Sequence, residues 1–194
     1  MNPFVAEDIQ RRLILASASP RRRELLERIG FEIPYDVSDF AESNHADDPI
    51  AAAHANALGK ARDVAARHPE SLVLGADTVV ILDGRILGKP ADAADAARTL
   101  AALSAREHEV VTALALLGSG IEDVRHSCTR VQFRELRSDE IAVYVASGEP
   151  VDKAGAYGIQ GLAAQFIERI EGCYFNVMGL PLELLTRMLE TRGG

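Results

Sequence analysis

The sequence is poor in cysteine, which limits the kinds of metal and redox centre that it can build. Its two cysteines, Cys128 and Cys173, are too far apart to form a CxxC pair. No histidine lies at metal-ligand spacing from either one, so a thiolate metal centre is not expected. We interpret both as ordinary buried thiols.

Long apolar runs and an excess of basic residues are also missing. The start MNPFVAEDIQRR has no apolar stretch long enough for a signal peptide or a membrane span. We therefore expect a cytoplasmic protein that does not interact with membranes. The formal net charge of −8 argues against binding to a nucleic-acid polymer, since a non-specific grip on that backbone needs many Lys and Arg. A phosphate-binding site in this chain has to be a local exception.

Several common catalytic motifs are absent. The five histidines form no HxH or HExxH pattern, and Ser17 and Ser19 lack the GxSxG context of an acyl-transfer nucleophile. The segment 84–90 resembles a Walker loop only superficially, because its glycine spacing is wrong and Pro90 stands where a Ser or Thr should bind magnesium.

What is present is the composition of a folded domain, with 47 % hydrophobic and 26 % charged residues. We predict that residues 1–194 form a single domain. Strand-like and helical segments alternate, but the middle of the chain is richer in strands than a regular βαβ series. The pattern favours an α/β fold with a mixed twisted sheet, flanking helices and two lobes around a cleft.

The expected elements follow from hydrophobic periodicity and from turn and cap residues. Strands are predicted at residues 12–16, 31–35, 72–82 with an interruption at 75–78, 86–87, 109–117, 123–133 and 164–171. Helices are predicted at residues 20–30, 49–68, 91–103, 138–147 and 181–192, and 153–161 is predicted to be a glycine-containing loop.

The segment Ser17-Ala18-Ser19-Pro20-Arg21-Arg22 lies where the first strand passes into a helix. Ser19 and Pro20 are suited to the N-cap and first helical positions. Unpaired backbone N–H groups at such a junction favour an anion, and the hydroxyls and guanidiniums add donors for phosphate oxygens. The alternative is a capped surface helix whose arginines are solvated.

Two carboxylates stand out. Asp77 lies within a run built for burial, where a carboxylate is costly unless it is paired, binds a metal or acts as a base. The alternative is that Asp77 caps a turn at the end of the strand. Glu42, in a polar segment, could supply a second ligand for a hard divalent cation, although by itself it would be interpreted as solvated.

Lysines complete the candidate site. Lys89 stands between Gly88 and Pro90, and Lys60 and Lys153 are further cations available to a polyphosphate. Each lysine alone is typical of an exposed surface residue. Together with the two arginines they indicate that an acidic protein concentrates positive charge in one cleft.

Three segments in order, LILASASPRRRELLERIGF, LGADTVVILDGRILGKP and DKAGAYGIQG, resemble the signature regions of the Maf-like nucleotide pyrophosphatases. The resemblance implies a fold related to inosine triphosphate pyrophosphatases, an active site in a cleft, a homodimer and a divalent metal, Mg²⁺ or Mn²⁺. It implies Asp77 as the proton acceptor, with Glu42 and Asp77 as metal ligands. The other positions that match polar residues of the family are Ser17, Arg21, Arg22, Lys60, Thr78, Lys89 and Gln160, of which Arg21, Thr78 and Gln160 match those linked to substrate choice.

The sequence also departs from the family pattern. Relatives commonly carry Asp-Glu where this chain has Ala41-Glu42, which removes a carboxylate beside Glu42. The third segment resembles the branch that acts on dTTP and UTP, so we expect hydrolysis of these triphosphates, and of 5-modified uridine triphosphates, to monophosphate and pyrophosphate. One alternative is 7-methylguanosine triphosphate as substrate. An alternative of another class is a nucleotide-binding regulator of cell division.

Overall fold

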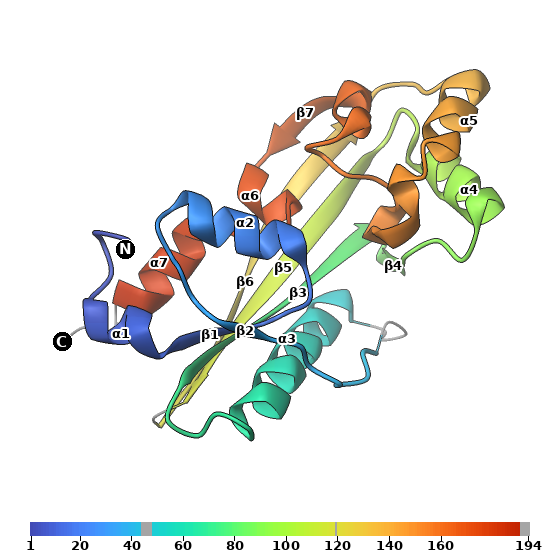
Figure 1. Ribbon diagram of the computed structural model, residues 1–194. Helices are drawn as coiled ribbons and strands as arrows, with labels where there is room; N and C mark the ends of the chain where they lie inside the picture. The colour runs from blue at the N-terminus through green and yellow to red at the C-terminus, as the bar shows by residue number, and fades with distance from the viewer. Residues whose placement is uncertain (44–47, 119, 191–194) are drawn as a thin grey trace.

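The computed structural model describes residues 1–43, 48–118 and 120–190 (Figure 1). The α-helices are α1 Glu7–Arg12, α2 Pro20–Arg28, α3 Pro49–Ala65, α4 Ala93–Leu103, α5 Ser138–Ala146, α6 Tyr174–Val177 and α7 Leu182–Glu190. The strands are β1 Leu13–Ala16, β2 Tyr35–Asp36, β3 Leu72–Leu82, β4 Arg85–Leu87, β5 Glu107–Gly118, β6 Ile121–Phe133 and β7 Ile167–Glu171. Short 3₁₀ helices are η1 Glu149–Asp152, η2 Ala154–Ala156 and η3 Leu162–Phe166.

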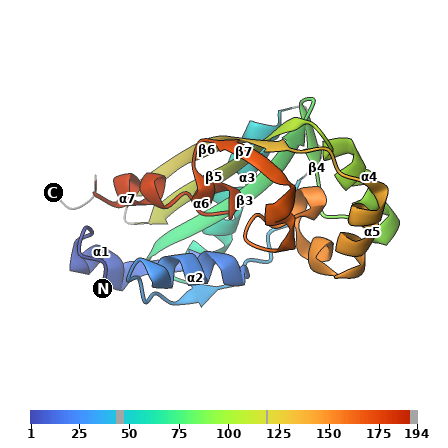
Figure 2. The same ribbon diagram turned by 90° about the horizontal axis from the view of Figure 1, so that it is seen from above.

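The strands form one mixed sheet in the order β2-β1-β3-β5-β6-β7, with β4 paired to β3. β1 runs parallel to β2 and β3, and the other pairs are antiparallel. Figures 1 and 2 show α4 and α5 at one end of the long strands, and α1 and α7 at the opposite end. The expected mixed α/β sheet with flanking helices is confirmed. That residues 1–194 form a single domain stays a prediction.

Most elements lie where the sequence predicts them, but three predictions were wrong. The expected interruption of β3 at residues 75–78 does not occur, because these residues continue the antiparallel ladder with β5. The strand expected at 31–35 is reduced to β2, because strand pairing with β1 begins only at Tyr35. Residues 164–166 belong to η3, and only 167–171 form a strand. Residues 191 and 192 of the expected last helix lie outside the described part.

The cores follow from the alternation of side chains along β3. Its odd-numbered residues face α3, where Val73, Val79 and Ile81 join one hydrophobic cluster. Its even-numbered residues face the other helices, but they divide between two clusters. Leu72, Leu74 and Ala76 pack with α1, α2 and α7, whereas Val80 and Leu82 pack with α4 and α5. The polar residue Thr78 lies where one cluster gives way to the other, so the expected two lobes correspond to two cores on one face of the sheet.

One edge of β3 is left uncovered between these two cores. β1 ends at Ala16, opposite Gly75, and β4 begins its pairing at Val80. Residues 76–79 therefore have a strand neighbour only on the β5 side. Backbone groups at such an edge need other partners, which makes it a natural place for a binding site.

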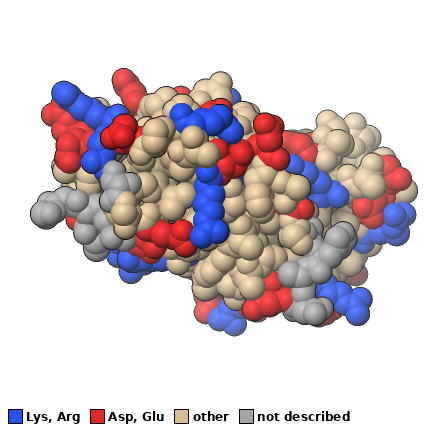
Figure 3. All heavy atoms as spheres, turned by 90° about the horizontal axis from the view of Figure 1, so that it is seen from below, with Lys and Arg blue, Asp and Glu red and all other residues tan. Residues whose placement is uncertain are grey.

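The surface carries charges of both signs. On the face seen in Figure 3, Lys and Arg side chains are interspersed with Asp and Glu. In the described part of the chain, no helix is long and apolar enough to cross a membrane.

A first prediction concerns Gly75, where α3 approaches β3 most closely. A Cβ added there would lie 2.1 Å from the carbonyl oxygen of Ala57. Because this contact is with backbone, Gly75→Ala should reduce the free energy of unfolding by about 1–3 kcal/mol or more. Gly88→Ala is the matched control, since its added Cβ would meet no atom within 4 Å, and it should change stability by less than ~0.5 kcal/mol. Equal stability of both variants in urea denaturation would contradict the close packing of α3.

Candidate functional site

The uncovered edge of β3 opens into a cavity of about 370 Å³. It is bounded by the loop between β1 and α2, by the segment 37–42 before α3, by Lys89 after β4, and by the segments 152–160 and 177–179. The lining includes every candidate of the sequence analysis: Ser17, Ser19, Arg21, Arg22, Glu42, Lys60, Asp77, Thr78, Lys89, Lys153 and Gln160. The structure thus brings these candidates together from six separate parts of the chain. Their individual roles stay predictions.

Arg22 is the most constrained side chain of this cavity. It is buried, and its guanidinium donates to the backbone carbonyls of Gly179 and Ala76 and to the hydroxyls of Ser17 and Thr78, at 2.8–3.1 Å. Desolvation by burial lowers its pKa, and the charge of Asp77 opposes that shift. An arginine stays charged in spite of such a shift. Four of its five N–H donors bind these protein groups, and one N–H on Nη2 is left for a ligand.

The first turn of α2 has the geometry that the sequence analysis expects of an anion site. Ser19 occupies the N-cap and Pro20 the first position of the helix, as predicted, but the Ser19 side chain makes no capping hydrogen bond. Instead, the Ser17 hydroxyl accepts from the backbone N–H of Ser19, at 3.2 Å. The backbone N–H groups of Arg21 and Arg22 have no protein partner among the described residues, so they remain available to an anion.

Asp77 projects toward α3 and is nearly buried, with 7 % of its side chain exposed. Lys60 Nζ lies 2.7 Å from Asp77 Oδ1 and 2.6 Å from Glu42 Oε1, so one ammonium joins both carboxylates. Asn56 Nδ2 donates to Asp77 Oδ2 at 3.1 Å. The turn-capping alternative for Asp77 is wrong, because the residue lies inside β3 and its carboxylate is held by side chains of α3.

These two carboxylates are suited to a divalent cation. Among the described residues, no group of three or more His, Cys, Asp or Glu side chains is placed to hold a metal ion. Mg²⁺, however, is commonly bound through one or two carboxylates together with substrate phosphates. Asp77 and Glu42, which both contact the Lys60 ammonium, are two such carboxylates near the N-terminus of α2, and that they hold a metal stays a prediction.

The electrostatics at Glu42 are dominated by cations. Its partial burial raises the pKa of its carboxyl. The hydrogen bond and charge of Lys60, followed by the charges of Lys89 and Arg22, together lower that pKa by more than burial raises it. The net result is a lowered pKa. Glu42 is therefore held as an anion although part of its surface is removed from water.

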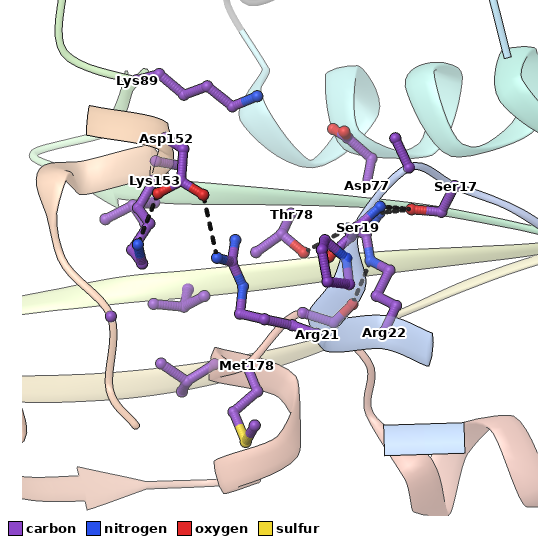
Figure 4. Close-up of a pocket in the computed structure, with 18 of the residues that line it drawn as sticks. Ser17, Ser19, Arg21, Arg22, Asp77, Thr78, Lys89, Asp152, Lys153 and Met178 are labelled. Atoms are coloured by element: carbon purple, nitrogen blue, oxygen red, sulfur yellow. Dashed lines mark hydrogen bonds and ion pairs between the residues drawn. The ribbon is translucent and has the colours of Figure 1, made fainter. Parts of the chain in front are cut away.

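A second charged group lies on the opposite side of the cavity (Figure 4). Asp152 stands between Arg21, at 3.5 Å, and Lys153, at 2.6 Å. Lys153 Nζ also donates to the carbonyl oxygen of Glu149. The hydrogen bond and charge of Lys153, and the charge of Arg21, lower the pKa of the Asp152 carboxyl. Two of the predicted phosphate cations are thus partly neutralised by a carboxylate of the same pocket.

Lys89 and Gln160 are exposed, like Glu42, which is paired with Lys60. The side chains of Lys89 and Gln160 have no hydrogen bond or ion pair with any described residue of the chain. Figure 4 shows Lys89 extending across the pocket toward the side on which Asp77 lies. Both residues keep their donors and acceptors for a ligand.

Sequence reasoning missed three polar residues of this site. Asn56 lies in an alanine-rich helix, Asp152 directly precedes Lys153, and Thr112 lies in the middle of an apolar strand. A buried polar residue within an apolar run was the one available signal for Asn56 and Thr112. The prediction that both cysteines are buried was wrong, since Cys128 is exposed and Cys173 is partly exposed.

An α/β fold whose cleft joins a helix N-terminus, a buried arginine and paired carboxylates defines a protein built to bind a small phosphorylated molecule. Comparison with known proteins gives the family. The Maf-like protein family matches residues 12–192, and the chain belongs to that family.

Two similar relatives are both named dTTP/UTP pyrophosphatase. The protein from Moorella thermoacetica is 53 % identical over 185 residues, covering 94 % of this chain and 95 % of the relative. The protein from Symbiobacterium thermophilum is 50 % identical over 182 residues, covering 93 % and 94 %. Among solved structures, the Staphylococcus aureus Ham1 protein matches with a TM-score of 0.52 at 15 % identity, over 93 % of this chain and 98 % of that one. This likeness shows a shared fold.

A second prediction follows from the shared ammonium of Lys60. Lys60→Met removes the hydrogen bond and the nearest charge that stabilise the Glu42 anion, so the pKa of Glu42 should rise. A lowered pKa stabilises the fold above the pKa of an unfolded glutamate, and this contribution is lost as the pH falls through the folded-state value. Lys60→Met should lack the pH-dependent stabilisation that the lowered pKa of Glu42 gives the parent.

Side-chain ¹³C NMR titration of Glu42 checks the shift directly. Lys60→Arg, which keeps the charge, is the matched control and should hold the pKa of Glu42 below its ordinary range. An unchanged Glu42 titration in Lys60→Met would show that Lys60 does not stabilise the anion.

Proposed function

We propose that this protein hydrolyses dTTP and UTP to the nucleoside monophosphate and pyrophosphate, as the names of its relatives state for them. The observation that carries the proposal is the convergence, at the open edge of β3, of the N-terminus of α2 with a nearly buried carboxylate held by Lys60 and Asn56. By the same reasoning, 5-modified uridine triphosphates are substrates if the pocket has room at C5.

The alternation of β3 separates the two ends of the substrate. Asp77 points to the charged side, with Lys60 and Glu42. Thr78 points to the opposite face, where Val80 and Val110 line the cavity together with the segments 177–179 and 159–160. We assign the polyphosphate to the charged side and the first turn of α2, and the base to the apolar side.

In the proposed reaction, water attacks the α-phosphorus, the bond between that phosphorus and the bridging oxygen breaks, and pyrophosphate leaves. Asp77 accepts the proton of the attacking water, and Asn56 and Lys60 hold its carboxylate in position. Lys89, Arg21 and the free N–H groups of α2 bind phosphate oxygens. A divalent cation held by Asp77 and Glu42 would supply further neutralisation of the triphosphate.

Base selection is assigned first to Gln160, whose amide can pair with N3–H and a ring carbonyl of uracil or thymine. These two bases share that edge. Measuring kcat/KM for dTTP, UTP, CTP and 7-methylguanosine triphosphate tests the assignment, with pyrophosphate and orthophosphate scored separately. We expect dTTP and UTP to lead, and CTP to be slower by one or more orders of magnitude.

Gln160→Ala should lower this preference, and Gln165→Ala, an exposed glutamine outside the cavity, is its matched control. Orthophosphate as the sole first product would overturn the proposal that the protein is a pyrophosphatase. A methylated purine that equals both pyrimidines would favour the alternative substrate.

Asp77→Asn tests the general base. The change keeps the shape of the side chain and removes its basicity, so turnover should fall by at least ~10². Asp83→Asn makes the same change in an exposed hairpin residue outside the cavity and should leave turnover unaltered. A folded Asp77→Asn protein with parental turnover would make Asp77 a structural residue, and binding without turnover in the parent would favour the nucleotide-binding regulator.

The homodimer implied by the family resemblance and the cytoplasmic location expected from the sequence stay predictions. Size-exclusion chromatography with light scattering checks the first.

A further inference from the structure

Thr78 belongs to a chain of hydrogen bonds that continues into the buried sheet. Its hydroxyl accepts from Arg22 Nη2 at 3.0 Å and lies 2.9 Å from the hydroxyl of Thr112, its partner across the β3–β5 ladder. The Thr112 hydroxyl lies 2.9 Å from the backbone carbonyl oxygen of Asn176. Thr112 and Asn176 are both completely buried.

The direction of each bond in this chain follows from counting protons. A carbonyl oxygen can only accept, so the single proton of Thr112 is directed to Asn176. Thr112 then has no proton for Thr78, and the Thr78 hydroxyl must donate to Thr112. The reverse order would leave two lone pairs facing each other in a buried site, which is costly. Thr78 therefore gives its proton to the protein and has one lone pair left.

Thr78 lines the cavity, so this lone pair is what its hydroxyl can offer a ligand. Gly179 lies beside it with a φ of +101°, and a Cβ added there would be 3.3 Å from Thr78 Oγ1. A side chain at this position would crowd the hydroxyl, whereas glycine leaves it accessible. Thr78 lines the cavity as a fixed acceptor.

A fixed acceptor restricts what Thr78 can bind. The phosphate oxygens of a triphosphate accept hydrogen bonds, so Thr78 cannot bind them through its hydroxyl. The donors that dTTP and UTP share are the 3′-hydroxyl and N3–H of the base. Since Thr78 projects to the apolar side with Val80 and Val110, the base is the part of the substrate that it meets.

We infer that Thr112 is a specificity-determining positioning residue: by taking the proton of Thr78, it fixes that hydroxyl as the acceptor for N3–H of uracil or thymine, which leaves a ring carbonyl of the base to the NH₂ group of Gln160. This inference rests on the proposed function. Cytosine presents an unprotonated N3, which faces the Thr78 lone pair and is rejected. The side-chain amide of Gln160 makes no hydrogen bond with any described residue and can flip, so its preference depends on a neighbour that cannot reverse, and Thr78 is that neighbour.

The test is Thr112→Val, which keeps the shape of the side chain and removes the acceptor. The Thr78 proton becomes free to turn toward N3 of cytosine, so the preference for UTP over CTP should fall by at least ~10-fold. The backbone carbonyl of Asn176 keeps its bond from the N–H of Gly179. Thr112→Ser restores the hydroxyl and should restore the parental preference.

Thr129→Val is the matched structural control. Thr129 is also buried and also bonds to Asn176, but it has no contact with Thr78 among its hydrogen bonds. Thr129→Val should lower the stability of the fold without changing the ratio of kcat/KM for UTP to that for CTP. A folded Thr112→Val protein with the parental ratio overturns the inference, as does a ratio change of equal size in Thr129→Val.

Two further measurements keep the outcome decisive. Should Thr112→Val not fold, Thr112→Ala must show the same shift, and a changed ratio in Thr112→Ser contradicts the inference independently. Dissociation constants for the α,β-imido analogues of UTP and CTP test the same ratio without turnover. Failure of the proposed reaction is then visible as absent pyrophosphate, and failure of the inference as an unaltered binding ratio.

Discussion

The buried guanidinium of Arg22 is the interaction on which the site depends. It joins the loop after β1, the open edge of β3 and the segment before α7, which are distant in sequence. A buried charge is tolerated only when its donors are satisfied, so these parts of the chain are held at fixed distances from one another. The cavity lies against this bonded group, and its geometry is therefore set before a ligand arrives.

The second constraint is the gap between β1 and β4 along β3. A sheet edge without a neighbouring strand exposes both faces of the strand to one cavity, and successive side chains then enter it from opposite sides. This is how a carboxylate and a hydroxyl that are adjacent in sequence, Asp77 and Thr78, serve different ends of a ligand. The same gap divides the hydrophobic core of that face into two clusters.

The segment 152–160 of the cavity wall is held in place by the hydrophobic cluster that contains α4 and α5. Tyr157, in the segment that carries Gln160, shares a hydrogen bond of 2.8 Å with His108 on β5. Burial lowers the pKa of His108 to about 4, so this histidine is neutral near pH 7 and is compatible with its apolar surroundings. The segment that carries the exposed residue Gln160 is thus held to the sheet by the hydrogen bond between Tyr157 and His108.

The sequence by itself determined most of the element types, the mixed sheet and the identity of most charged residues of the pocket. Periodicity and turn chemistry are local, and the conspicuous polar residues, such as Asp77 in an apolar run, are visible without a fold. It could not show that β3 runs unbroken through residues 75–78, because that continuity comes from the ladder with β5, which is distant in sequence. It also gave no reason to connect Asn56 with Asp77, or Thr112 with Thr78. Those connections depend on packing between elements distant in sequence, and hydrogen-bond direction is decided only when every partner of a buried group is known. The tertiary structure therefore decided which way each polar group of the site points and what it has left to offer a ligand.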